Sequence, residues 1–178
     1  MGYPTIGQFD VNIISRTIQN LDAKVQNTYT HLVNSLMGLV ILPRQWNLQR
    51  RRTITSFESR ILESENLNFL NNKDIFTNED NLYKEIPILE LRGKNIQEIT
   101  FKDIIDNLRH SVAHQSIRPT QENNSWHGII FRSYRNDEQA THWGNDYRMQ
   151  LYLTEEQLRI LVTEIADKYL AEVDNNDQ

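Results

Sequence analysis

The sequence predicts a mainly α-helical protein, a helical bundle with a small antiparallel β-hairpin before the last helix. Three observations predict this fold: apolar residues recur at helical spacing in three segments, threonine-led capping boxes open two of them, and two β-prone runs precede the last. At 178 residues the chain has the usual length of one domain. We expect a single domain over residues 1–173 and a disordered tail over residues 174–178.

The composition excludes several classes of protein. The chain has no cysteine, so disulfides, thiolate metal sites and thiol nucleophiles are excluded. It has neither an export signal nor an apolar run of about 18 residues, so we expect a cytoplasmic protein with no membrane partner. The net charge of -5 argues against coating nucleic acid through bulk electrostatics, so any contact with phosphate must be local.

The first helical region covers residues 9–42. Its first part is amphipathic, because Ile14, Ile18 and Leu21 follow helical spacing. Its last part, LVNSLMGLVIL, is apolar nearly all round, which is typical of a helix packed on several sides, and Pro43 ends it.

The middle of the chain, residues 44–98, is polar and has no clear periodicity. We expect a solvated connector with one helix at about residues 57–70, and the sequence leaves the rest of its structure open. The basic cluster at residues 50–52 is either a contact for RNA phosphates or a hydrated surface.

The second helical region begins after Thr100, which forms a capping box with Asp103. Pro119 disfavours helical geometry before it, so the helix should end by about Ser116. Its inward positions recur at helical spacing: Phe101, Ile104, Ile105, Leu108 and Val112.

The hairpin is predicted from SWHGIIFRSYR and DYRMQLYL, which a polar loop joins. In the second run an inward set, Tyr147, Met149, Leu151 and Leu153, alternates with an outward set, Arg148, Gln150 and Tyr152. Thr154 and Gln157 then form the capping box of the last helix.

The candidate site is the stretch LRHSVAH near the end of the second helical region. It places Arg109, His110 and His114 within six residues. On an ideal helix Arg109 and His114 point about 140° apart, so one straight helix does not bring both to one phosphate. Two copies of the helix crossing near a two-fold axis would each supply an arginine and a histidine to a shared groove.

These residue types suit cleavage of RNA by its own 2′-hydroxyl. That reaction needs a base, an acid and a cation near the phosphate, and no metal or other cofactor. Histidine exchanges protons near neutral pH, and arginine binds phosphate oxygens through two parallel hydrogen bonds. The sequence leaves open whether His114 acts as the base or the acid.

Other interpretations compete for the same residues. In a purely structural interpretation, Arg109 and the histidines face solvent or pair with Asp103 and Asp106. In a metalloenzyme interpretation, His110 and His114, one turn apart, bind zinc with Asp103, Asp106 or His127. A second arginine and histidine pair, Arg135 and His142, has similar spacing but lies in the predicted hairpin loop.

The run FKDIIDNLRHSVAH resembles the signature helix of the HEPN superfamily, whose motif is an arginine, a polar residue, and a histidine after four to six intervening positions. RTIQNLDAKVQ, THLVNSLMGLVILPRQW, the two strands and YLTEEQLRIL also resemble the bacterial, often plasmid-borne, single-domain HEPN nucleases. The likeness covers both ends of the chain and matches residues 44–98 poorly.

The resemblance implies a HEPN-like helical bundle, a homodimer and a metal-independent endoribonuclease, as in many toxin and antiviral-defence proteins. It makes Arg109 and His114 the catalytic residues and suggests an antitoxin or defence-system partner. His110 stands where asparagine is more usual in the motif, so we treat it as a supporting residue. Some HEPN domains are inactive, so the alternative is a dimerisation module that binds a nucleotide or a protein.

Overall fold

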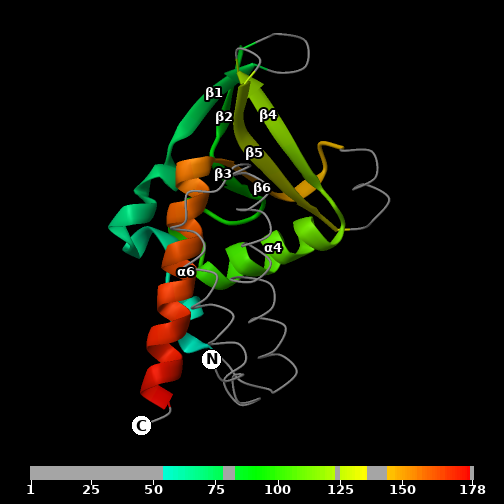
Figure 1. Cartoon of the computed structure of the whole chain (residues 1–178). Helices are drawn as coiled ribbons and strands as arrows, with labels where there is room; N and C mark the ends of the chain where they lie inside the picture. Colours follow the sequence, from blue (N-terminus) through cyan, green and yellow to red (C-terminus); the bar gives the residue numbers. More distant parts are fainter. Residues whose placement is uncertain (1–53, 78–82, 123–124, 136–143, 177–178) are drawn as a thin grey trace, which may run out of the picture.

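The computed structural model describes residues 54–77, 83–122, 125–135 and 144–176 (Figure 1). Within these ranges the chain forms a four-stranded antiparallel sheet, a two-stranded antiparallel sheet and two α-helices. The expected helical bundle is therefore wrong for the described part of the chain, which mixes α and β structure. The region predicted to form the first helices, residues 9–42, lies outside the described residues.

The strands of the larger sheet lie in the order β3-β6-β5-β4. The predicted hairpin is confirmed as β5 (Ser125–Tyr134) and β6 (Tyr147–Thr154), which pair antiparallel. Two strands that the sequence did not indicate extend it: β3 (Leu89–Leu91) beside β6, and β4 (Ile117–Glu122) beside β5. The hairpin is thus the centre of a sheet, and this is the main reason that the bundle was the wrong expectation.

The predicted alternation along β6 holds only in part. Arg148 is exposed as expected, but Gln150 and Tyr152 are buried, although the pattern placed them on the outer face. Both side chains contact side chains of β5: Arg132 donates to the Gln150 side chain at 2.7 Å, and the His127 ring stacks on Tyr152. An interior strand with both faces covered does not keep a polar outer face.

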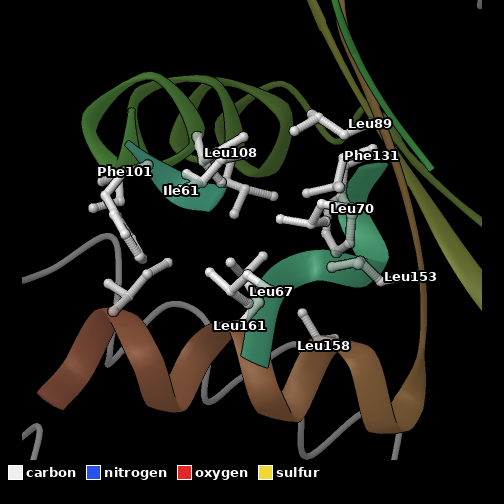
Figure 2. Close-up of a cluster of buried hydrophobic side chains, with 14 of the residues drawn as sticks. Ile61, Leu67, Leu70, Leu89, Phe101, Leu108, Phe131, Leu153, Leu158 and Leu161 are labelled. Carbon is white, nitrogen blue, oxygen red and sulfur yellow. The ribbon is translucent and has the colours of Figure 1, made fainter. Parts of the chain in front are cut away.

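The segment that precedes β1, residues 54–71, contributes side chains to the core, so the expectation of a solvated connector is wrong there. In place of one helix over residues 57–70 it forms three short 3-10 helices: η3 (Thr55–Glu58), η4 (Ile61–Glu63) and η5 (Glu65–Asn71). Their apolar side chains insert between α4 and α6, as Ile61 and Leu67 show in Figure 2. A 3-10 helix has three residues per turn and breaks after a few residues, so the segment lacks the longer period of an α-helix.

A second hairpin follows, formed by β1 (Lys73–Thr77) and β2 (Tyr83–Pro87). After β3, a single turn of 3-10 helix, η6 (Ile96–Glu98), leads into α4. The basic cluster of residues 50–52 lies outside the described residues.

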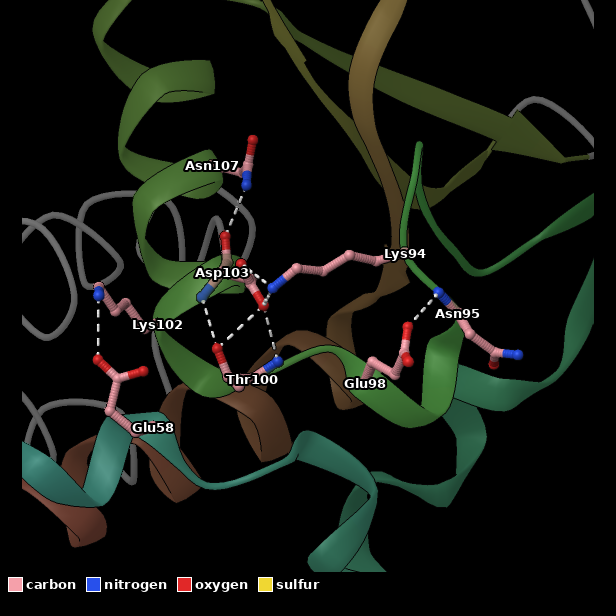
Figure 3. A network of polar contacts seen from close by, with 8 residues as sticks. All are labelled: Glu58, Lys94, Asn95, Glu98, Thr100, Lys102, Asp103 and Asn107. Carbon is pink, nitrogen blue, oxygen red and sulfur yellow. Dashed lines mark hydrogen bonds and ion pairs between the residues drawn. The ribbon is translucent and has the colours of Figure 1, made fainter.

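The two predicted α-helices are confirmed as α4 (Phe101–Ala113) and α6 (Glu155–Asn176). Both predicted capping boxes are present. In α4 the Thr100 hydroxyl accepts from the backbone of Asp103 at 3.2 Å, and the Asp103 carboxylate accepts from the backbone of Thr100 at 3.0 Å (Figure 3). α6 continues to Asn176, so residues 174–176, expected in the tail, are helical.

The main core lies where α4, α6, the 3-10 segment and the sheet meet (Figure 2). Phe101 and Leu108 from α4, Leu158 and Leu161 from α6, and Phe131 from β5 are all fully buried. Phe101 and Leu108 are among the inward positions that the helical spacing predicted. α4 is thereby held against β5, which sets the position of its carboxyl-terminal half.

Candidate functional site

Two of the candidate residues, Arg109 and His110, lie on the last turns of α4, and the third, His114, is its C-cap. Arg109 and His110 are half-buried and His114 is exposed. The rings of His110 and His114 lie close together, with centroids 4.3 Å apart and planes tilted by 43°. The structure therefore brings the two histidines together. On an ideal helix, by contrast, the Arg109 side chain points about 140° away from that of His114.

The end of α4 is defined by a residue with left-handed backbone geometry. Gln115 has φ of 53°. The backbone N–H of Gln115 donates to Val112 at 3.1 Å, and that of Ser116 donates to Ser111 at 2.8 Å. This pair of bonds is a Schellman motif, and it makes His114 the C-cap of the helix. The helix thus ends well before Pro119, and the local cause is Gln115.

A set of buried polar residues beside the candidate site was not predicted. Asn107 is 4% exposed, although it is a polar residue outside the apolar positions that define the inward face of the helix. Its side-chain oxygen accepts a hydrogen bond from the Ser133 hydroxyl of β5 at 2.6 Å. Its side-chain nitrogen donates to the backbone oxygen of Asp103 at 2.7 Å (Figure 3). Ser111 is fully buried and donates to the backbone of Asn107 at 2.9 Å.

A weak signal for this set exists in the sequence. Asn107 and Ser111 are four residues apart, so two short polar side chains lie one above the other on α4. Ser133 interrupts the β-prone run IIFRSY. The sequence does not pair the helix with that strand, so it does not show that these residues meet.

Asp103 has a structural role at the start of α4. Its carboxylate accepts from the Lys94 ammonium at 2.7 Å and from the Thr100 backbone and hydroxyl (Figure 3). Partial burial acts to raise the pKa of Asp103, but the hydrogen bonds from Lys94 and Thr100 outweigh it and hold the pKa below its ordinary value. Asp103 is thus an ionised cap rather than a proton carrier at neutral pH.

The residues of the zinc interpretation do not form a site within the described ranges. His127 lies on β5 with its ring stacked on Tyr152, at a centroid distance of 6.3 Å. No group of three or more histidine or carboxylate side chains suited to a metal ion occurs among the described residues.

The second arginine and histidine pair is only partly described by the structure. Arg135 is exposed just after β5, but its expected counterpart His142 lies outside the described residues.

Among the helices that are described, none combines the length and the apolar character needed to cross a membrane.

A family model described as HEPN pEK499 p136 matches residues 1–176 of the chain. The match includes the undescribed residues 1–53 as well as α4, β4, β5, β6 and α6. No curated protein and no solved structure matches the chain.

Proposed function

Because the chain belongs to the HEPN pEK499 p136 family, we propose that it is a metal-independent endoribonuclease with a site shared between two copies of the chain. The predicted membership of the HEPN superfamily is confirmed, and membership by itself suggests a HEPN-type nuclease or a related function. The observation that carries the finer proposal is the end of α4. There Arg109, His110 and His114, which resemble the HEPN motif, occupy the last turns and the C-cap.

The proposed reaction is an attack of the ribose 2′-oxygen on the adjacent phosphorus. A neutral imidazole accepts the 2′-hydroxyl proton, the new P–O bond forms, and the bond to the 5′-oxygen breaks. An imidazolium protonates that leaving oxygen, which yields a cyclic phosphate and a 5′-hydroxyl end. His114 is the proposed proton carrier, and Arg109 binds the phosphate oxygens as negative charge develops on them.

His110 has a supporting role in this proposal. Its ring lies 4.3 Å from that of His114, so the two imidazoles lie side by side at the end of α4. The pair therefore places a second group of the type that carries protons beside the proposed proton carrier.

The first prediction concerns the two catalytic residues. Purified protein should cut mixed RNA in the presence of EDTA, and Arg109→Ala or His114→Ala should reduce the rate by about a hundredfold to ten-thousandfold, because each removes charge stabilisation or proton transfer. The rate is measured by following the length of labelled RNA on denaturing gels.

Matched controls are available on the sheet. Arg148 is an exposed arginine on β6, and His127 lies on β5, so Arg148→Ala and His127→Ala should cleave at the wild-type rate. Absence of cleavage by wild type, or cleavage that survives in both site variants, would contradict the proposal. A toxin or defence role belongs to the same proposal, and growth and RNA integrity in bacteria expressing wild type beside His114→Ala would test it.

The second prediction concerns the dimer. If two chains build one site, the activity per chain should fall on dilution below the dissociation constant of the dimer, because a lone chain holds half of the site. Activity is measured over a series of protein concentrations, and light scattering gives the mass at each. Full activity from a species with the mass of one chain would reject the shared site.

The alternative is an inactive module that binds RNA, a nucleotide or a protein through the same groove. The residue that favours it is His110, which replaces the more usual asparagine and alters how a phosphate would be held. Binding of RNA with no product over hours, in a preparation that is folded and dimeric, would favour this alternative.

A further inference from the structure

A buried polar contact joins the carboxyl-terminal half of α4 to β5. Asn107, Ser111 and Ser133 are 4%, 0% and 1% exposed. Polar side chains are costly to bury unless they are hydrogen-bonded, and here each one is, through the contacts at 2.6, 2.7 and 2.9 Å. The one contact of this set that links two elements is the bond from the Ser133 hydroxyl to the Asn107 side-chain oxygen.

This contact lies on the face of α4 that also carries the candidate histidine. On an ideal helix, positions seven residues apart differ by about 20° in direction, so Asn107 and His114 share one face. His110 is about 60° from Asn107 on the same wheel. A rotation of α4 about its axis that breaks the bond to Ser133 therefore also changes the directions in which His110 and His114 point relative to β5.

A second attachment holds the end of the helix to the same strand. The Schellman bond fixes Ser116 to Ser111, and the backbone oxygen of Ser116 accepts from the backbone N–H of Arg132 at 3.0 Å. Arg132 is the neighbour of Ser133 in β5. The two turns that carry Arg109, His110 and His114 are thus attached to adjacent residues of one strand, at Asn107 and at Ser116.

We propose that Asn107, through its hydrogen bond to Ser133, is a positioning residue of the RNA-cleaving site. The inference rests on the proposed function. Apolar contacts along the rest of α4 are not directional, whereas a hydrogen bond of 2.6 Å between two buried side chains sets both the rotation of the helix and its position along β5. A misplacement of about 1 Å at a reacting group can cost about a hundredfold in rate.

The test separates this role from stability alone. Ser133→Ala and Asn107→Leu each leave one buried partner without its hydrogen bond, and both should lower the unfolding midpoint. They should also lower kcat by about tenfold to a hundredfold, with KM changed by no more than about twofold. The double variant, Asn107→Leu with Ser133→Ala, removes both partners and should regain much of the unfolding midpoint while its kcat stays low.

A matched control removes a different hydrogen bond between elements. Ser64→Ala deletes the bond of 2.8 Å from the Ser64 hydroxyl to Glu164 of α6 and leaves α4 attached to β5. It should lower the unfolding midpoint with kcat unchanged. If the double variant regains the wild-type kcat along with its stability, the bond is structural only and the inference is overturned.

A measurement without RNA keeps the two proposals distinguishable. The imidazole proton signals of His110 and His114 should shift or broaden in Ser133→Ala and in the double variant, and should stay unchanged in Ser64→Ala. Failure of the wild type to cleave RNA would reject the proposed function. The imidazole signals would still decide whether the bond from Ser133 to Asn107 positions the two histidines. Identical imidazole signals in the wild type and the double variant would reject the positioning role.

Discussion

Replacement of Leu67 by alanine is expected to lower the free energy of unfolding by about 2–5 kcal/mol. Leu67 is fully buried in η5, between α4 and α6 (Figure 2). Truncation removes apolar contacts and leaves a cavity among residues that are held by both helices, so the site has little freedom to collapse. Chemical denaturation followed by circular dichroism measures the change.

Leu62→Ala is the matched control for Leu67→Ala. Leu62 is the same residue type in the same segment, but it is only partly buried at the edge of the core. We expect it to lose clearly less stability, because less surface is withdrawn from water there. Equal and small losses in the two variants would show that the segment is a solvated connector, as its composition first suggested.

Replacement of Gly128 by alanine is expected to cost about 1–3 kcal/mol through overpacking. A Cβ atom at Gly128 would lie 2.7 Å from the Tyr152 ring and 2.8 Å from the backbone oxygen of Leu153. The Tyr152 ring is fully buried and stacks with His127, and the Leu153 carbonyl belongs to the neighbouring strand, so the packed sheet must shift to admit the Cβ. Thermal or chemical unfolding measures the loss.

Gly93→Ala serves as the comparison, because it tests backbone conformation without crowding. Gly93 has φ of 85°, and no atom lies within 4 Å of the position that a Cβ would take there. Alanine at this position should therefore lower the free energy of unfolding only through the strain of left-handed backbone geometry, by about 1 kcal/mol. An unfolding midpoint for Gly128→Ala equal to that of wild type would mean that β5 and β6 do not approach each other as described.

The elements that the sequence predicted are those with local signals. Capping boxes at Thr100 and Thr154 place the starts of α4 and α6, and helical spacing gives their inward faces. The hairpin followed from two β-prone runs. By contrast, β3 has three residues and β4 contains Pro119, so neither carries a strand pattern of its own. Such strands exist because the neighbouring strand offers hydrogen bonds.

The sequence by itself determined that Arg109, His110 and His114 lie near the end of one capped helix, because capping and helical spacing act over a few residues. Only the tertiary structure decided which polar residues of that helix are buried. Asn107 and Ser133 are 26 residues apart, and their contact depends on which strand packs against α4. Burial is a property of the packed elements, so a pattern within one helix leaves it open.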